Sequence, residues 1–584
     1  MRLPAILLLA SSAFAQIPSE DARNTNPPNT DTHFKMPEYK TLAEWEQRRT
    51  HLRKQILSAS GLTPMPEKTP LTPRIFGRIE HKDYSIEKVL LQTLPNYFLG
   101  GNLYRPIGRS GKLPAVVSPH GHWTYGRIEH QPLGSIPARA INLARQGYVV
   151  FAYDMVGYND TVQTPHAFGG PREQLWSFGP LGLQLWNSIR AVDFLESLPE
   201  VDAKRIGATG ASGGGTQTFL LTAVDDRVAF SAPVNMISAI MQGGSPCENA
   251  PNLRVRAFNV EIGAMMAPRP MLMVSATGDW TRNTPREEFP AIRSIYALYD
   301  RAAYVEEKQI DAPHNYNQAS REAVYGFFGR RVLEARDVSQ FTEKPVRVEK
   351  LQDMLALHGR PLPEGALSFE ALVEQWISHA KRQNDATSGV EEFRERLRYA
   401  LLAEWPDSVS IEQTGERLLL GRPGRGDRVS GFWAKAAGPA TLIVNGEGAE
   451  AARKTDAFRT LASARKNVMT IDAFQTGAAR GPRDRSPRHY LTFNQTEDAN
   501  RVQDILTALK ALEQSGASEL RLVGQGRAAV WCLFAAAVAG KRVTLEADLK
   551  DFKGEDADFI DRFFVPGIQR AGGLRAARIV TGLK

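Results

Sequence analysis

Between residues 113 and 335, hydrophobic runs of strand length alternate with stretches of helical periodicity. The runs are almost continuously apolar, which is typical of strands buried on both faces of a parallel sheet. The stretches between them have the length and periodicity of helices that cover such a sheet. The strand-like runs are 113–121, 148–157, 205–210, 227–234 and 269–278, and the helical stretches are 136–147, 183–199 and 212–224. This pattern predicts an α/β fold with a mostly parallel, doubly wound sheet.

The pattern outside this region predicts further parts of the chain. Arg2, an apolar stretch of about ten residues and then Ala13-Phe14-Ala15 are typical of a secretory signal peptide. The polar segment that follows is rich in Pro, Asn, Asp and Thr, which favours disorder. We expect a signal peptide at 1–15, a disordered lead and N-terminal helix at 16–70, an α/β domain at 71–335, a helical linker at 336–395 and a second α/β domain at 396–584.

The second α/β region repeats the pattern of the first in the same order. Its segments 440–446, 467–477, 499–506 and 519–543 resemble 115–121, 148–157, 188–195 and 204–228 respectively. Matched segments at nearly constant separation indicate a duplicated fold. In this alignment Gly526 takes the place of Ser212, and the last histidine of the chain is His489. We therefore expect the second copy to be degenerate, and to act either as a structural buttress for the first or as a wall of a binding cleft.

Composition limits the kinds of partner. The net charge is +8, but the basic residues are scattered and no nucleic-acid-binding motif is present, so we expect no nucleic-acid partner. Apart from the signal peptide, no segment has the length and hydrophobicity of a membrane span, which favours a secreted or periplasmic protein without stable membrane insertion. Cys247 and Cys532 could pair in an oxidising compartment or remain free.

A candidate nucleophile lies where the run 205–210 ends. Gly210-Ala211-Ser212-Gly213-Gly214 has the G-x-S-x-G spacing of a serine on a sharp strand-to-helix turn. A serine hydroxyl needs a base, a carboxylate that orients the base, and donors for the developing oxyanion. Asp279 follows the run 269–278, with Glu287 and Glu288 in reserve, and His314 is the one histidine between Ser212 and residue 350. We expect Ser212, His314 and Asp279 to form the triad.

The oxyanion hole should combine two backbone N–H groups. Gly213 follows the nucleophile, and the loop after the run 113–117 supplies His122, with Gly121 as the alternative. His120 and His122 could also suggest metal ligands, but no Glu or third His follows at ligand spacing. We therefore expect neither a catalytic metal nor a cofactor.

Residues 113–335 resemble the α/β-hydrolase superfamily. The resemblance rests on the segments GASGGGTQT (210–218), SPHGHW (118–123), GDW (278–280), HNYN (314–317) and 243–254. Within the superfamily, the chain is most similar to secreted bacterial acetyl xylan esterase-related and dienelactone-hydrolase-like members. The resemblance implies ester or amide hydrolysis, and the order Ser, Asp, His is that of the superfamily. Dienelactone hydrolases use a cysteine nucleophile and glucuronoyl esterases carry an arginine after the nucleophile. Ser212 and Gly213 depart from these patterns and disfavour both activities.

Aromatic and basic residues on the same loops suggest a carbohydrate substrate. Sugar rings stack on aromatic faces, and arginines could pair with a uronate carboxylate. The candidates are Trp123, Arg127, Trp176, Arg254, Trp280 and Arg282. We expect a carbohydrate ester as the substrate, with polysaccharide deacetylation first and a uronate methylesterase as the alternative. A prolyl-oligopeptidase-like peptidase and a non-catalytic carbohydrate-binding protein are further alternatives.

Overall fold

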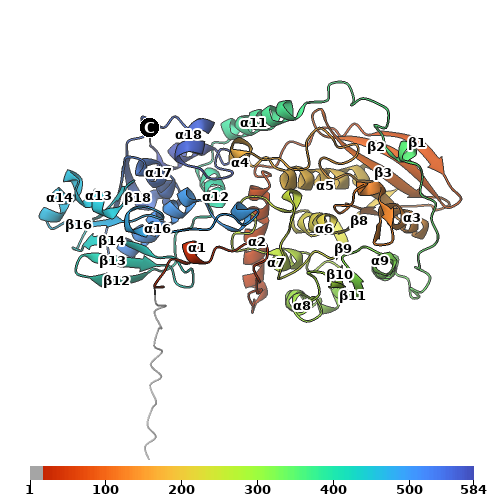
Figure 1. Ribbon diagram of the computed structural model, residues 1–584, viewed down its shortest axis with the longest axis horizontal. Helices are drawn as coiled ribbons and strands as arrows, with labels where there is room; N and C mark the ends of the chain where they lie inside the picture. Colours follow the sequence, from red (N-terminus) through yellow and green to blue (C-terminus); the bar gives the residue numbers. More distant parts are fainter. Residues whose placement is uncertain (1–16, 584) are drawn as a thin grey trace, which may run out of the picture.

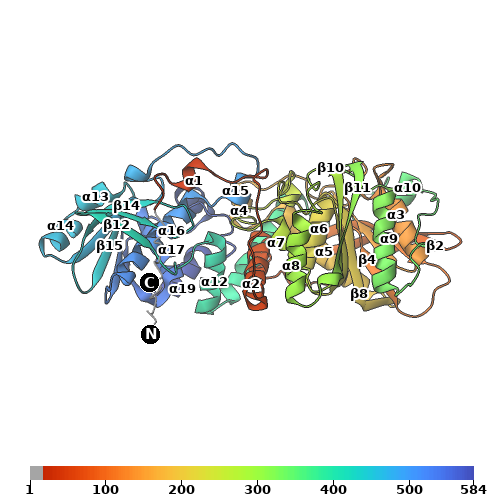
Figure 2. The same cartoon turned by 90° about the horizontal axis from the view of Figure 1, so that it is seen from below.

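The computed structural model describes residues 17–583, so the predicted signal peptide lies outside the described residues. Two α/β domains lie end to end, and helix α2 (Leu42–Ala59) stands between them (Figure 1). The view from below shows the same arrangement (Figure 2). The fold class predicted from the hydrophobic pattern is therefore confirmed.

The first domain is built on a nine-stranded sheet in the order β1-β2-β3-β7-β4-β8-β9-β10-β11. From β7 to β11 neighbouring strands are parallel, while β1, β2 and β3 extend the sheet in antiparallel fashion. The strands are β1 (Arg74–Glu80), β2 (Tyr84–Leu94), β3 (Tyr97–Pro106), β4 (Leu113–Val117), β7 (Val149–Tyr153), β8 (Val201–Ala211), β9 (Val228–Val234), β10 (Met271–Gly278) and β11 (Val305–Pro313). Because parallel strands end on one edge, the loops after β4, β8, β10 and β11 can meet there.

Two hydrophobic cores cover the two faces of this sheet. Along β4, Ala115 and Val117 pack in one core and Val116 in the other, as the two-residue period of a strand requires. Helices α3 (Ile136–Gln146) and α9 (Gln318–Val332) belong to the second core. Helices α5 (Pro180–Ser197), α6 (Gly213–Val224) and α8 (Glu288–Leu298) belong to the first. The strand-like runs of the sequence are thus buried on both faces.

The second domain repeats part of this topology. Its seven-stranded sheet has the order β12-β13-β14-β16-β15-β17-β18, which corresponds to β1-β2-β3-β7-β4-β8-β9 of the first domain. Its strands are β12 (Ser410–Thr414), β13 (Arg417–Gly421), β14 (Val429–Ala434), β15 (Ala440–Asn445), β16 (Asn467–Ile471), β17 (Leu520–Gln525) and β18 (Val543–Ala547). The described part of this sheet has no counterpart of β10 and β11. The predicted second copy is therefore present, without the strands that precede the acid and the base in the first.

The two domains share one hydrophobic core. Residues from α5 and α6 belong to the same buried cluster as residues from α11 (Phe369–Ala386), α12 (Val390–Leu401), α17 (Ala528–Ala539) and α19 (Gly573–Thr581). Polar contacts cross the same boundary: Trp376 Nε1 donates to the carbonyl of Trp176 at 3.0 Å, and Arg570 Nε donates to that of Gly61 at 3.0 Å. The second domain is thus packed against the first over a continuous apolar interior.

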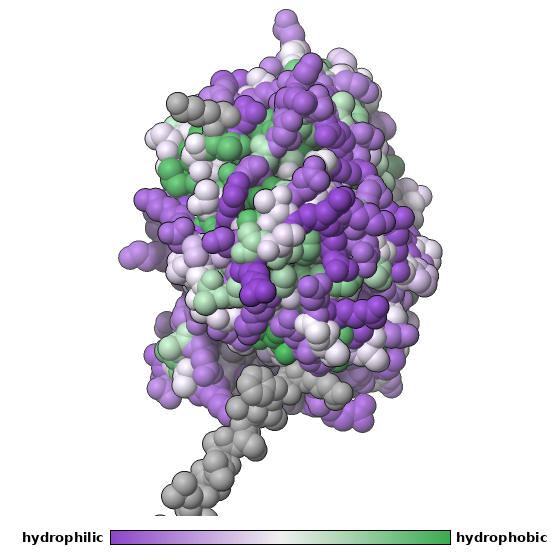
Figure 3. Space-filling model, turned by 90° about the vertical axis from the view of Figure 1, so that its left-hand side faces the viewer, coloured by the Kyte–Doolittle hydropathy of each residue, from purple (hydrophilic) through white to green (hydrophobic). Residues whose placement is uncertain are grey.

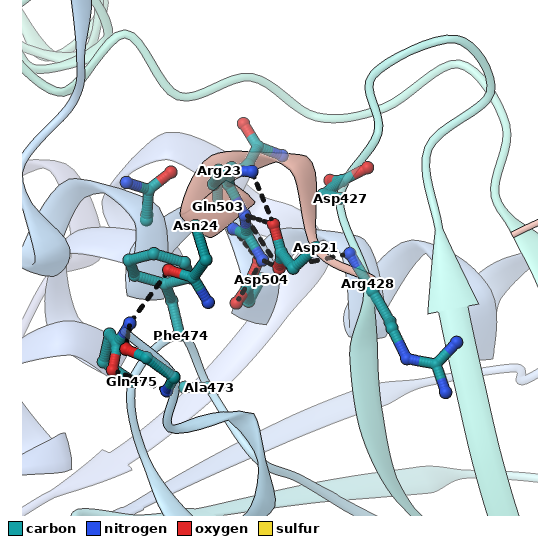
Figure 4. A network of polar contacts seen from close by, with 12 residues as sticks. Asp21, Arg23, Asn24, Asp427, Arg428, Ala473, Phe474, Gln475, Gln503 and Asp504 are labelled. Atoms are coloured by element: carbon teal, nitrogen blue, oxygen red, sulfur yellow. Dashed lines mark hydrogen bonds and ion pairs between the residues drawn. The ribbon is translucent and has the colours of Figure 1, made fainter. Parts of the chain in front are cut away.

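Over residues 17–35 the N-terminal lead is ordered, whereas its polar composition predicted disorder. Arg23, in the short helix α1 (Ala22–Thr25), donates to the buried Asp504 carboxylate at 2.7 Å and lies 4.4 Å from the Phe474 ring centroid (Figure 4). Phe34 stacks on Phe258 of the first domain at 5.3 Å between ring centroids, and on Phe493 of the second. A few anchoring side chains therefore hold an otherwise polar segment across both domains.

The end of the molecule formed by the second domain presents a mostly hydrophilic face. Hydrophobic residues appear there as small islands between polar ones (Figure 3). Within residues 17–583, no helix is both long and apolar enough to cross a membrane.

Candidate active site

Ser212 lies on a strained turn between β8 and α6. Its backbone has φ 58° and ψ −126°, a combination that an L-residue adopts only when its surroundings enforce it. The turn is closely packed: a side chain at Gly210 would come within 2.6 Å of the Gly214 carbonyl oxygen, and one at Gly214 within 2.6 Å of the Pro119 carbonyl oxygen. The strand and helix therefore approach each other only because glycines flank the serine.

The loop after β4 lies directly against this turn. A Cβ at Gly121 would lie 3.1 Å from the Ser212 Cβ, and a Cβ at Gly213 would lie 2.7 Å from Cε1 of His122 and 2.5 Å from Cε of Met155. The three residues predicted to form the oxyanion hole, Gly121, His122 and Gly213, are therefore neighbours of the serine.

His120 has a structural position in the same loop. Its ring is fully buried; Nδ1 donates to the Gly121 carbonyl at 2.7 Å, and Nε2 accepts from the Met155 N–H at 2.9 Å. Burial lowers the pKa of His120 to about 3. The ring is neutral in the folded protein and links the loop after β4 to the loop after β7.

The acid and the base predicted from sequence contact each other. His314 Nδ1 donates to Asp279 Oδ2 at 2.7 Å. The other carboxylate oxygen accepts from the Thr281 N–H at 2.7 Å and from its hydroxyl at 2.6 Å. The Asp279 side chain is only 2% exposed, and its carboxylate oxygens contact the imidazole and Thr281 of its own loop. This arrangement fixes the tautomer of His314 with its proton on Nδ1.

The second ring nitrogen of His314 is left to react. Nε2 is buried and has no hydrogen-bond partner within residues 17–583. Trp280 packs against the ring with 4.4 Å between centroids. A neutral imidazole with a free Nε2 lone pair is the form that can accept a proton from a serine hydroxyl.

The reserve acids are engaged elsewhere. Glu287 pairs with His33 Nε2 at 2.5 Å, and Glu288 accepts from the Ala239 N–H at 2.8 Å. Asp279 is therefore the acid that the geometry supports.

The structure corrects part of the predicted substrate-binding set. Arg127 is fully buried and paired with Asp154 and Asp160, while Arg254 is fully buried among backbone and amide oxygens of residues 248–259. Trp176 is 2% exposed and donates to Asp556 in the second domain. These side chains therefore stabilise the fold. The prediction was wrong because their partners, carboxylates and carbonyls from other loops, cannot be recognised from the sequence.

The remaining predicted side chains stay near the triad. Trp123 is half-buried, and its Nε1 lies 3.3 Å from the position that a Cβ at Gly121 would take. Trp280 packs on His314, and Arg282 is exposed three residues after Asp279. These side chains are available to contact a substrate.

Sequence reasoning missed a second group of side chains beside the serine. His122 Nε2 lies 3.1 Å from Cys247 Sγ, and the rings of His122 and His166 are 5.2 Å apart between centroids. Cys247 and Cys532 are both buried and free, so they do not pair with each other. No local spacing signals this cluster, because its members are up to 125 residues apart.

The second domain helps to build the loop that carries Cys247. The N–H groups of Asn252 and Arg254 donate to the carbonyls of Leu491 and Thr492, both at 2.8 Å. A cavity of about 400 Å³ lies at this junction. Residues of both domains line it, including Phe168, Phe178, Pro246, His489 and Tyr490. The domain boundary therefore reaches the surroundings of the active site.

Comparison with known proteins agrees with this fold. No protein-family model matches the chain. "Putative hydrolase YtaP" of Bacillus subtilis (strain 168) is 27% identical over 274 residues, covering 43% of this chain and 88% of that protein. The solved structure of "Methylesterase BT1017" is 31% identical, with a TM-score of 0.50, and the match covers 60% of this chain and 78% of that one. A shorter match is to "Uncharacterized protein PA2218" of Pseudomonas aeruginosa, which is 30% identical over 153 residues. This match covers 26% of this chain and 36% of that protein.

The strand order, the strained serine turn and the similarity to a solved esterase define the class of the protein. The chain belongs to the α/β-hydrolase superfamily and is a hydrolase of the carbohydrate-esterase type.

Proposed function

We propose that the protein is a serine esterase in which Ser212, His314 and Asp279 act as the triad. The observation that carries the proposal is the His314–Asp279 hydrogen bond of 2.7 Å, which leaves a buried, unpartnered Nε2 on the edge of the sheet where the strained Ser212 turn also lies. Each group follows the strand that the superfamily uses for it: β8, β10 and β11.

The reaction proceeds in two steps of acyl transfer. His314 Nε2 takes the Ser212 proton as the oxygen attacks the ester carbonyl, and the backbone N–H groups of Gly213 and His122 stabilise the oxyanion. The alcohol leaves with the proton from His314. Water then attacks the acyl-enzyme with the same base and releases the acid and the free Ser212 hydroxyl.

The substrate class is a carbohydrate ester. Half-buried Trp123 and Trp280 beside the triad supply surfaces on which sugar rings can stack. Removal of acetyl groups from a polysaccharide is the first candidate. A methyl ester of a uronate is the second, and the similarity to "Methylesterase BT1017" favours it. We also propose that the chain is exported, on the basis of its first 15 residues.

The test measures acetate and methanol released from acetylated xylan and from methyl-esterified pectin. We expect Ser212→Ala and His314→Gln each to lower kcat by at least ~10³-fold, the scale for loss of a triad member. His130→Gln, which changes an exposed histidine, serves as the matched control. Acetate alone identifies a deacetylase and methanol alone a methylesterase. If a folded protein releases neither, or if Ser212→Ala stays within tenfold of wild type, the proposed function is wrong.

A further inference from the structure

Three donor side chains converge beside the catalytic turn from loops that are distant in sequence. His122 follows β4, His166 lies in the long connection after β7, and Cys247 lies between β9 and β10. Each side chain offers one ligand atom, and these three atoms all lie within 4.8 Å of one another. A tetrahedral ion bound by two imidazole nitrogens and one thiolate holds them about 3.3–3.6 Å apart, so only small side-chain shifts separate this arrangement from a closed site.

His166 is already oriented as a ligand. Its Nδ1 donates to the carbonyl of Val156 at 2.7 Å, which places the proton on Nδ1 and leaves a lone pair on Nε2. That Nε2 is buried and has no hydrogen-bond partner in the described chain. A backbone carbonyl on the far nitrogen is the usual way in which proteins orient a metal-binding imidazole.

Cys247 is held in place by its own loop. Glu248 accepts from the N–H groups of Gly244 and Ser245 at 2.8 and 3.0 Å, which closes the turn that carries the cysteine. Cys247 is fully buried, and its Sγ contacts Nε2 of His122. The thiol is thus fixed facing an imidazole instead of being free to rotate among apolar groups.

We infer that His122, His166 and Cys247 form a binding site for one thiophilic divalent cation, with Zn²⁺ as the ion that suits this donor set. Two neutral imidazoles and one thiolate match the preference of zinc for nitrogen and sulfur ligands. Binding replaces the thiol proton: the S–H bond breaks, an S–Zn bond forms, and one H⁺ is released to solvent. Three protein ligands leave the fourth position for water or another oxygen ligand.

This site borders the serine but does not depend on the triad. The ring of His122 lies where a side chain at Gly213 would be, so the ion and the ester carbonyl would occupy adjacent space. The ligands include none of the triad members. Metal binding and ester hydrolysis can therefore be tested separately.

The decisive measurement is the absorption spectrum of the EDTA-treated full chain titrated with Co²⁺, which replaces Zn²⁺ in tetrahedral sites. We expect one equivalent to give a thiolate-to-cobalt charge-transfer band that Zn²⁺ displaces. Cys247→Ala should abolish the band. Cys532→Ala is the matched control, because it removes the other buried thiol and leaves the band unchanged. His166→Gln should weaken Zn²⁺ binding, measured by calorimetry, at least ~10-fold.

Each outcome decides the proposal. A band in Cys532→Ala assigns the thiolate to Cys247 even if Cys247→Ala fails to fold, since no other cysteine remains. Ser212→Ala should keep the band, because Ser212 is not a ligand. A wild-type protein that binds Co²⁺ but hydrolyses no ester would contradict only the proposed esterase function. Absence of the band in wild-type protein, or its survival in a folded Cys247→Ala variant, would show that there is no such metal site.

Discussion

At the scale of single residues, two turns that each follow a strand share a positive φ but differ in their packing. Ser212 has φ 58° and Gly526, at the matching point after β17, has φ 59°. Around Ser212 the glycines are crowded, with Met155 and His122 close to Gly213, whereas a Cβ at Gly526 would meet nothing within 4 Å. The second turn thus keeps the positive φ without the packing that surrounds Ser212.

Gly213→Ala should therefore impair the enzyme and its stability together. The new methyl group would force Met155 and His122 apart, and such overpacking costs about 1–3 kcal/mol. We expect a fall in kcat of at least ~10-fold, because an N–H that stabilises the oxyanion moves with this turn. Gly526→Ala is the control: it should cost about 1–2 kcal/mol for its left-handed backbone and leave kcat unchanged. Equal kcat in both variants would contradict the oxyanion role of this turn. Chemical denaturation and ester hydrolysis measure both effects.

His120 should make the protein sensitive to acid. Because burial lowers the pKa of His120 to about 3, the unfolded chain binds a proton below about pH 6.5 that the folded chain does not. Stability from this group is present above pH 6.5 and is lost as the pH falls toward 3. Relative to His120→Gln, the wild-type free energy of unfolding should fall by up to ~1.4 kcal/mol per pH unit between pH 6 and 4. Urea denaturation at several pH values measures the difference, and a constant difference would contradict a neutral buried ring.

At the scale of secondary-structure elements, the short helix α1 shows how a polar segment is anchored. Arg23 donates to Asp504 of helix α16 (Glu497–Gln514), whose side chain is 1% exposed (Figure 4). Burial raises the pKa of the Asp504 carboxyl to about 6. The cation on the lead therefore compensates a carboxylate inside the second domain.

Arg23→Ala should destabilise the protein more at pH 8 than at pH 5. Above its pKa the Asp504 carboxylate would be buried without its cation, which costs about 3–5 kcal/mol, whereas the protonated form needs no partner. Arg480→Ala is the control, since its ion pair with Glu447 is exposed and should contribute at most ~1 kcal/mol at either pH. Thermal and urea denaturation at the two pH values test this difference. Equal losses for the two variants would mean that the lead does not stabilise the second domain.

Local patterns reveal elements better than they reveal partners. The apolar runs predict β4 and β7 to β10 because a strand that is buried on both faces consists of consecutive apolar residues. Ser212, Asp279 and His314 are predictable because each follows a strand at a fixed place in the order. The burial of Arg127 and the approach of Cys247 to His122 are not, since each depends on a contact between loops far apart in the chain.

At the scale of the whole molecule, the second domain is part of the fold of the first. The shared core and the bonds from Asn252 and Arg254 to residues 491 and 492 tie the loop near the active site to the second sheet. The two sheets lie end to end with α2 between them, and the shared core joins them across this helix (Figures 1 and 2).

A chain that ends at residue 340 should therefore fail to fold into a stable hydrolase. It would expose apolar residues of the first domain that now pack against the later part of the chain, such as Phe178 against Trp376 and helix α2 against α12, and exposed apolar surface promotes aggregation. A control keeps all residues but adds a protease site at residues 360–364. After cleavage there, the two pieces should stay associated in gel filtration and keep esterase activity. A monomeric, active truncated chain would contradict the shared-core requirement.

The described part of the second sheet lacks strands that match β10 and β11, and this restricts how the second copy can evolve. A serine could return at position 526 through a single substitution, but within residues 17–583 this sheet lacks the strands that would carry its acid and base. The loss is therefore irreversible by point mutation, and selection on this half acts through the support it gives to its neighbour. Its loops can diverge freely except where they brace the first domain, so residues 489–492 should change more slowly among descendants than the rest of that surface.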